Sequence, residues 1–339
     1  MFDLDLLRKL TDARGVTGDE TEVAELIAEL CRDRSDSVEI DALGNVIAFK
    51  KGKSSAKTVM ADAHMDEVGL YVNHIGDEGL IKFTTLGIDP RVVNGRRVLV
   101  GPKRVKGVLG TKPIHLQSAE ERTIAPAMER MYIDIGAKDG GEAKRHVNVG
   151  DTVIFDSDFV EFGEDCVKAR ALDNRLGCAI QLEAMKHQPY YDTCYVFSVL
   201  EESGGHGARV ATMAVEPDVA IVIDTTSAAD HVEKPVKARS CIPGNGAVIF
   251  LMESSTYYNP LSVQKAKAIA ERAGVRWQHK TVTLGGLDSG SIQRTGYGVE
   301  TIAIATPCRY IHSASCTAKK GDMEETLKLM IALLTSEEL

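Results

Sequence analysis

Side chains that can hold a divalent cation follow several apolar, strand-like stretches of this sequence. His64 ends TVMADAH and Asp66 comes two positions later, while YVFSVL leads directly into Glu201 and Glu202. Imidazole and carboxylate groups are the ligands of hydrolytic zinc, cobalt and manganese sites. Further candidates of the same two types are Asp224 at the end of DVAIVID, Asp173 in ALDNR and His312 in RYIHSA.

The adjacent Glu201 and Glu202 require a physical explanation, because two neighbouring carboxylates repel each other. A divalent cation supplies the positive charge that lets them approach. Successive residues that leave a strand point in different directions, so one glutamate can bind a metal while the other acts as a base. Two cations that share a water lower its pKa and polarise a carbonyl group. The pattern therefore favours metal-assisted hydrolysis.

Strands and helices alternate in the parts of the chain that must position these groups. We expect helices over 172–188, 207–215 and 323–339, between strands such as TVMADAH, TCYVFSVL, DVAIVID and VETIAIAT. This alternation predicts an α/β fold with a mostly parallel central sheet flanked by helices. Open sheets of this kind bind ligands beyond the carboxyl ends of their strands, which is where the candidate ligands fall.

Two helix starts have recognisable sequence signals. Thr17 and Glu20 have the spacing of a capping box ahead of the helical stretch VAELIAEL. Asn259 followed by Pro260 predicts a helix that begins with an asparagine cap and a proline in its first turn.

The middle of the chain has a different pattern of predicted secondary structure. Between residues 69 and 164, short β-type runs are broken by glycine turns, and no convincing helix of ten residues interrupts them. Such a density of short strands predicts a small barrel or sandwich. We therefore expect a catalytic α/β domain made of residues 1–68 and 165–339, with a β-rich insertion at 69–164.

Composition narrows the class of protein. The 339 residues carry a net charge of −9, which argues against nucleic acid or an anionic membrane as a partner. No apolar run approaches the ~18 residues of a membrane span, and the N-terminus lacks the pattern of a signal peptide. Seven scattered cysteines with no CxxC pair are typical of reduced thiols. We expect a cytoplasmic protein.

The motifs resemble those of the M42 family of metallo-aminopeptidases, the tetrahedral aminopeptidases, which also includes proteins labelled glutamyl aminopeptidase and endoglucanase. The resemblance runs essentially from end to end. It departs from the common pattern within EESGGHGA, GGLDSG and TTSAADHVEKPVKARSCIPGNG, at positions other than the candidate ligands. The matching stretches are AHMDEVG at 63–69, ALDNR at 171–175, FSVLEESGGHGA at 197–208, IDTT at 223–226, GGLDSGS at 285–291 and RYIHSA at 309–314.

The resemblance implies a ligand set for two divalent metal ions per subunit, zinc or cobalt, with manganese as a further possibility. Asp173 would bridge the two ions. His64 and Asp224 would complete one site, and Glu202 and His312 would complete the other. It also implies a zinc-exopeptidase-like fold and peptide substrates that are shortened from their N-termini.

Further roles follow from the same resemblance. Glu201 would be the general base, and Asp66 would orient His64. A cis peptide bond is expected between Asp173 and Asn174. The insertion at 69–164 would form dimers, which would build a dodecamer.

Three other functions fit parts of the pattern. A glycosidase could use Glu201 and Asp224 as its two carboxylates, but it would leave the histidines and Asp173 without a purpose. A dinuclear-metal deacylase or carboxypeptidase would share the ligands and differ in substrate. A catalytically silent assembly protein would not need metal ligands, so the intact set of candidate ligands argues against it.

Overall fold

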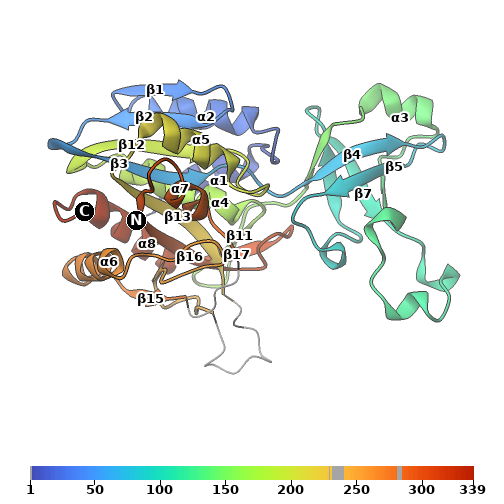
Figure 1. The fold of residues 1–339 in the computed structure, drawn as a ribbon. Helices are drawn as coiled ribbons and strands as arrows, with labels where there is room; N and C mark the ends of the chain where they lie inside the picture. The colour runs from blue at the N-terminus through green and yellow to red at the C-terminus, as the bar shows by residue number, and fades with distance from the viewer. Residues whose placement is uncertain (1, 229, 231–239, 281–284) are drawn as a thin grey trace. The chain divides into compact units, whose positions relative to one another are not determined.

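The computed structural model describes residues 2–228, 230, 240–280 and 285–339, and its chain divides into two compact units. The first is an α/β unit made of Met1–Asp66, Phe159–Ile311 and Cys316–Leu339. The second is a β-barrel unit made of Glu67–Asp158 together with the short segment His312–Ser315. Figure 1 shows both units coloured along the chain. No described helix is both long and apolar enough to cross a bilayer.

A mixed sheet forms the centre of the α/β unit, with neighbouring strands in the order β1-β2-β12-β3-β13-β16-β17-β11-β10. The four central strands, β12, β3, β13 and β16, are parallel, as expected for an α/β fold, and the flanking pairs are antiparallel. The strands are β1 (Ser37–Ile40), β2 (Val46–Lys50), β3 (Ser54–His64), β10 (Val160–Phe162), β11 (Cys166–Ala169), β12 (Tyr191–Ser198), β13 (Val219–Ser227), β14 (Ala247–Ile249), β15 (Trp277–His279), β16 (Glu300–Arg309) and β17 (Cys316–Lys319).

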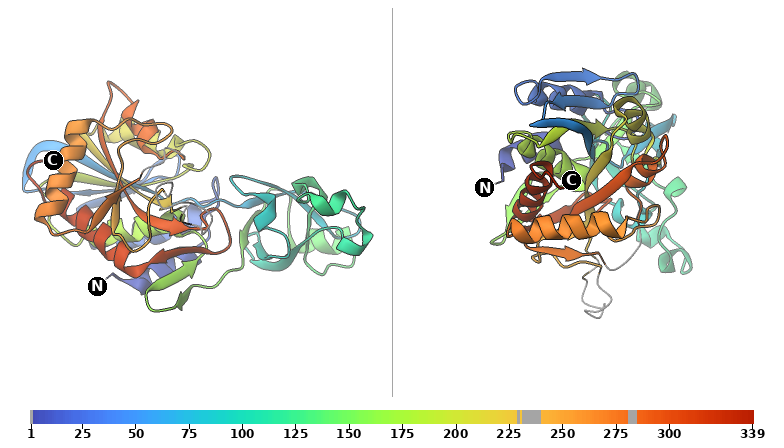
Figure 2. Two further views of the ribbon diagram at one scale, coloured as in Figure 1. Left: turned by 90° about the horizontal axis from the view of Figure 1, so that it is seen from below. Right: turned by 60° about the vertical axis from the view of Figure 1, so that its left-hand side comes forward.

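Helices cover both faces of this sheet (Figures 1 and 2). The helix α4 packs on β3 and β13 and is joined by α1 and α8, whereas α5 packs on β12 and β3 with α7 beside it. The flanked α/β architecture expected from the sequence is therefore confirmed. The helices are α1 (Leu4–Asp12), α2 (Thr21–Cys31), α4 (Leu172–Ala184), α5 (His206–Val215), α6 (Pro260–Arg272), α7 (Ser289–Gln293) and α8 (Lys320–Leu334).

One predicted helix start is confirmed and the other is wrong. The Asn259 side chain accepts a hydrogen bond from the Leu261 amide, and Pro260 is the first residue of α6. By contrast, α2 begins at Thr21 without any side-chain cap. The Thr17 hydroxyl donates to Asp66, and the Glu20 carboxyl accepts hydrogen bonds from the Gly18 and Leu200 amides. Glu20 itself is the N-cap of α2, so the helix does not begin with the capping box that the spacing suggested.

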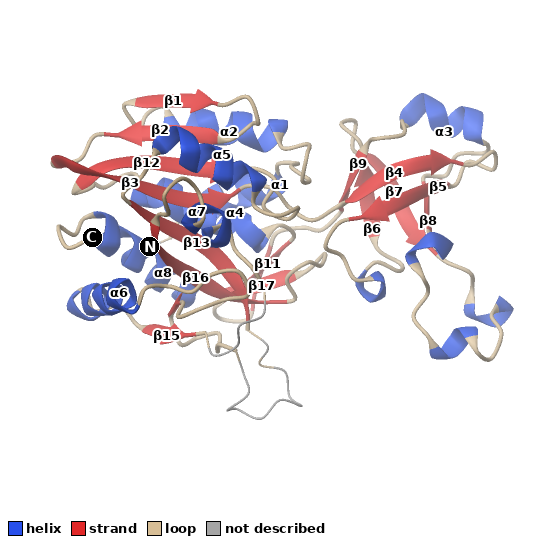
Figure 3. Ribbon diagram, in the orientation of Figure 1, coloured by secondary structure: helices blue, strands red, loops and turns tan. Residues whose placement is uncertain are grey.

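The barrel unit closes in the order β4-β5-β8-β7-β6-β9 (Figure 3). Val98, Leu109 and Ile133 are among the apolar residues that fill its interior. The expected insertion, 69–164, covers most of this unit but does not include the segment His312–Ser315. Its strands are β4 (Leu70–Ile75), β5 (Ile81–Thr85), β6 (Arg97–Val100), β7 (Val105–Gly110), β8 (Tyr132–Asp134) and β9 (Thr152–Phe155), and its helix is α3 (Gly140–His146).

Candidate metal centre

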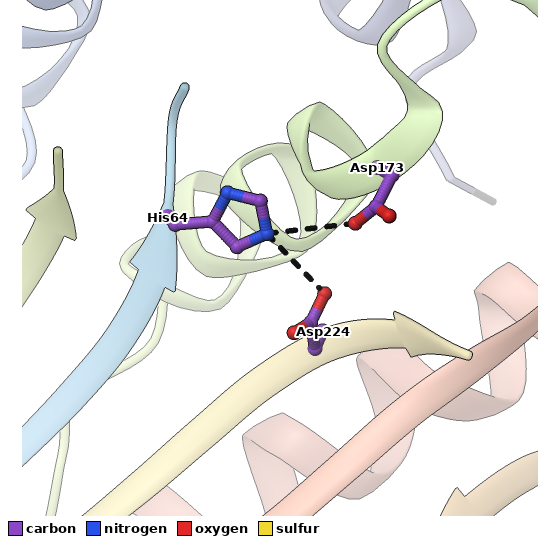
Figure 4. Close-up of side chains that lie close together, drawn as sticks. All are labelled: His64, Asp173 and Asp224. Atoms are coloured by element: carbon purple, nitrogen blue, oxygen red, sulfur yellow. Dashed lines mark ion pairs between the residues drawn. The ribbon is translucent and has the colours of Figure 1, made fainter. Parts of the chain in front are cut away.

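Three predicted ligands meet at the carboxyl ends of the central strands (Figure 4). His64 is the last residue of β3, and its Nε2 atom lies 3.4 Å from Asp173 Oδ1 and 3.6 Å from Asp224 Oδ1. Ligand atoms that surround a zinc ion tetrahedrally at ~2 Å stand roughly 3.3 Å apart. The three side chains therefore have both the chemistry and the spacing to hold one divalent cation.

Strand register explains why His64 and Asp224 face each other. In the parallel pair of β3 and β13, Asp62 lies opposite Val222. Two residues further along each strand, His64 and Asp224 are level and on one side of the sheet, because side chains alternate with a period of two.

Asp173 reaches the same place from the first turn of α4. Its backbone is not helical, and the peptide bond between Asp173 and Asn174 is cis, as expected. The Asn174 side-chain amide donates a hydrogen bond to the Ile223 carbonyl at 2.9 Å. This bond ties the start of α4 to β13, one residue before Asp224.

Asp66 connects His64 with the two glutamates. Its Oδ1 lies 3.3 Å from His64 Nδ1 and accepts a 3.0 Å hydrogen bond from the Glu201 amide. Its Oδ2 accepts a 3.2 Å bond from the Glu202 amide. Two opposing effects act on the pKa of Asp66. Burial alone would raise it, but the contacts with His64 and with the Glu201 amide outweigh burial and hold the pKa below its usual range. The Asp66 carboxylate thus directs Nε2 of His64 toward Asp173 and Asp224.

The electrostatics of this cluster suit a cation. Burial lowers the pKa of His64, yet Asp173, Asp224 and Asp66 more than offset burial, and the net pKa lies well above the ordinary value. Burial, with help from the charge of Asp173, raises the pKa of Asp224 to about 7. Positive charge is therefore favoured at Nε2, where it is supplied by a proton or by a metal ion.

Glu201 and Glu202 lie in the turn between β12 and α5. Leu200, just before them, has a φ of 59°, and Gly204 and Gly205 after them also have positive φ. Burial raises the pKa of Glu201 well above the ordinary value, and the charges of Asp288, Asp224 and Glu202 add to this effect. The structure therefore places both glutamates beside the His64 cluster through their shared contact with Asp66.

His312 belongs to the short segment that groups with the barrel unit. Its φ is 60°, and its Nδ1 lies 3.0 Å from the Gly87 carbonyl oxygen of the same unit. A contact of this kind at Nδ1 selects the tautomer that leaves Nε2 able to bind a metal.

Sequence reasoning missed a buried pair of carboxyl groups near the site. Asp62 and Asp288 are both fully or almost fully buried, and the Ser198 hydroxyl donates to Asp288 Oδ2 at 2.8 Å. Burial raises the pKa of Asp288 to about 6 and that of Asp62 well above its ordinary value, with a contribution from the charge of Asp288. Two signals in the sequence were available. Asp62 lies two residues before His64, on the same face of the expected strand, and Asp288 lies within the matching stretch GGLDSGS.

Comparison with known proteins agrees with this geometry. The family model described as M42 glutamyl aminopeptidase matches residues 44–329. The chain belongs to the M42 family. It is therefore a hydrolase of peptide bonds of the aminopeptidase type, as the sequence motifs indicated.

Three relatives illustrate the likeness. A putative aminopeptidase of Acetivibrio thermocellus is 37% identical, and the match covers 98% of this chain and 97% of the relative. The lysyl aminopeptidase of Pyrococcus furiosus is 32% identical over 98% of this chain and 97% of its own. The solved TET1 peptidase of Pyrococcus horikoshii, which can assemble into a tetrahedron or a large octahedral shell, is 32% identical with a TM-score of 0.86, covering 98% and 99% of the two chains.

Proposed function

We propose that this M42 protein is a dinuclear metal-dependent aminopeptidase that removes N-terminal residues from peptides. The observation that carries the proposal is the convergence of His64, Asp173 and Asp224 at one edge of the sheet, with Glu201 and Glu202 joined to them through Asp66. A set of carboxylates with an imidazole is the donor type of cocatalytic zinc, cobalt and manganese sites.

Five residues would hold the two ions. His64 and Asp224 would bind the first ion, Glu202 and His312 the second, and Asp173 would bridge them. Donor chemistry supports zinc or cobalt, since both accept mixed nitrogen and oxygen ligands, and manganese is compatible with the same set.

The chemistry supplied by the bound ions would be Lewis acidity toward the scissile carbonyl and a water of lowered pKa. The Glu201 carboxylate would accept the proton of that water and return it to the departing amine. Asp66 would hold the His64 ring and the amides of both glutamates in place. Burial of Glu201, which raises its pKa, suits a group that must both accept and donate a proton.

Assembly and location are part of the proposal. The barrel unit would form dimers that build a larger shell, which the reported assembly of the TET1 peptidase supports. The protein would work in the cytoplasm, which its seven free cysteines support.

Chelation tests the proposal directly. The purified protein, treated with a chelator, is expected to lose its turnover of amino-acid anilides and to regain it with zinc, cobalt or manganese. Metal analysis of the restored enzyme should give two ions per subunit. Full activity without metal, or hydrolysis of polysaccharide that survives chelation, would reject the proposal in favour of glycosidase chemistry.

The choice between an aminopeptidase and a deacylase or carboxypeptidase rests on the substrate. A peptide with a free N-terminus should be shortened from that end, while its N-acetylated form should remain intact. Preferential cleavage of the acetylated peptide, or removal of C-terminal residues, would assign the same metal site to the alternative reaction.

A further inference from the structure

The Thr17 side chain contacts Asp66, and the Glu20 side chain contacts Leu200 in the turn between β12 and α5 that carries Glu201 and Glu202. We propose that Thr17 and Glu20 are positioning residues for the reaction, with Thr17 fixing Asp66 and Glu20 fixing the backbone of Leu200. This inference rests on the proposed function, because it concerns how Asp66 orients His64 and how the turn presents Glu201.

A tight turn presents Thr17 to Asp66. Val16 and Asp19 form an isolated antiparallel bridge, and the Asp19 amide donates to the Val16 carbonyl at 2.7 Å. Gly18, inside this turn, has a φ of 84°, which glycine adopts readily and other residues rarely do. The position of Thr17 is therefore set by local backbone geometry.

The Thr17 hydroxyl donates a 2.9 Å hydrogen bond to Asp66 Oδ2, and both side chains are buried. A carboxylate has about four lone-pair sites. Those of Asp66 face the hydroxyl, the amides of Glu201 and Glu202, and the His64 ring. Because Asp66 has no exposed surface, water cannot readily replace a donor that is removed. Loss of the hydroxyl should therefore loosen the orientation of Asp66, and with it the orientation of His64.

Glu20 contacts the start of the turn between β12 and α5. Its Oε1 atom accepts hydrogen bonds from the Gly18 amide at 2.7 Å and from the Leu200 amide at 3.3 Å. Leu200 has a φ of 59°, a conformation that costs energy in a residue with a side chain and persists only where neighbouring groups hold it. Glu20 thus fixes the residue immediately before the general base, Glu201.

A substitution series at Thr17 separates positioning from simple packing. Thr17→Val keeps the shape of the side chain and removes the hydroxyl, Thr17→Ala removes it without a branched replacement, and Thr17→Ser retains it. The matched control is Thr11→Val, because Thr11 is also buried in the N-terminal segment and its hydroxyl bonds only to the Arg8 carbonyl among the described contacts.

Two readouts are needed for each variant: the affinity of the metal-free protein for zinc, by competition with a chelator, and kcat and KM of the metal-loaded enzyme. Outer-shell partners of metal-binding histidines contribute roughly 10–100-fold to metal affinity or activity. We expect Thr17→Val and Thr17→Ala to lose about that much in metal affinity, in kcat, or in both, with KM nearly unchanged. Thr17→Ser should remain close to wild type, and Thr11→Val should match wild type in both readouts.

The outcomes distinguish this inference from the proposed function. Wild-type metal affinity and kcat in either hydroxyl-free variant that folds would overturn the inference, and so would a Thr17→Ser enzyme as impaired as Thr17→Val. If both hydroxyl-free variants fail to fold, Thr17 acts through stability alone and the inference is likewise overturned. A wild-type enzyme that ignores chelation would instead reject the proposed function.

Discussion

Glu201 and Glu202 are neighbours in sequence and share one backbone partner, but the proposed function gives them different roles. Both amides donate to Asp66, so the backbone of the pair is fixed. Burial raises the pKa of Glu201, which favours a group that exchanges protons. Glu202 carries the ligand role in the proposed function, where its charge would be compensated by a metal.

Glutamine substitutions separate these two roles. Glu201→Gln keeps the shape of the side chain but cannot accept a proton, so kcat should fall by about 10²–10⁴-fold. Both metals should stay bound and KM should change little. Glu202→Gln weakens a charged ligand, so metal content and activity should fall together. Metal analysis with steady-state kinetics on both variants checks this, and loss of a metal from Glu201→Gln alone would reverse the assignment.

The pKa of Glu20 gives the stability of the protein a predicted pH dependence. Burial raises this pKa from 4.5 to about 7. Between these values the folded chain keeps a proton that the unfolded chain has released, so the contribution of Glu20 to stability falls as the pH rises. Above pH 7 the loss amounts to about 3 kcal/mol.

Urea denaturation at pH 4 and pH 8 tests this prediction. The Glu20→Gln side chain cannot ionise. The free energy of unfolding of this variant, relative to that of wild type, should therefore increase from pH 4 to pH 8. Glu25→Gln, at an exposed position of α2, controls for the loss of one negative charge. A stability difference between wild type and Glu20→Gln that stays constant with pH would contradict the prediction.

At the scale of the elements, the strands that carry the site could be predicted from the sequence. The expected strand TVMADAH lies within β3, which ends at His64, and DVAIVID coincides with β13 from Val219 to Asp224, although β13 continues to Ser227. DVAIVID contains a continuous apolar run, and TVMADAH is apolar from Val59 to Ala63 except at Asp62, which is the pattern of strands buried on two faces. Their carboxyl ends meet because parallel strands share one edge of the sheet.

Contacts between distant segments could not be predicted in the same way. Thr17 and Glu20 fit a local capping rule, but tertiary contacts with Asp66 and Leu200 took precedence over it. Asp62 and Asp288 come from opposite ends of the α/β unit's sequence, so nothing local signals their pairing. The cis peptide after Asp173 was expected only from the family resemblance, because neither residue type favours it.

The Arg175 side chain holds three elements together, so its replacement should lower the stability of the α/β unit. Its guanidinium is fully buried and donates to the Met65 carbonyl after β3 at 2.7 Å. It also donates to the Leu10 and Ala13 carbonyls, at and just after the end of α1, so that α4, β3 and α1 share one side chain. Each buried carbonyl that loses its donor costs about 1–3 kcal/mol.

The Ala13 carbonyl keeps a bond from Arg170, so two carbonyls lose their donor, and Arg175→Met should lower the free energy of unfolding by at least about 2 kcal/mol, measured by urea denaturation of the metal-free protein. The matched control is Arg209→Met, at an exposed position of α5, where a surface substitution should change stability by no more than about 0.5 kcal/mol. Equal unfolding midpoints for Arg175→Met and wild type would show that these hydrogen bonds contribute nothing to stability.

At the scale of the whole molecule, the chain builds two separate hydrophobic cores. The α/β core carries the described ligands of the first proposed ion, while the barrel has a smaller core of its own. A separate barrel can serve assembly without disturbing the sheet that positions the site. Its surface also carries three large apolar side chains, each more than half exposed, in the stretch between β7 and β8: Ile114, Leu116 and Ile124.

These three side chains give the proposed self-association a specific test. Exposed apolar groups clustered in one stretch are typical of interaction surfaces, and a buried charge opposes association. The triple variant Ile114→Asp, Leu116→Asp, Ile124→Asp should form a smaller particle than wild type by light scattering, while each subunit keeps its fold by circular dichroism. Met213→Asp, which alters an exposed apolar residue on α5 of the α/β unit, should leave the particle mass unchanged. If the triple variant assembles to the wild-type mass, these residues lie outside every contact that holds the particle together, and the dimer must form through another part of the chain.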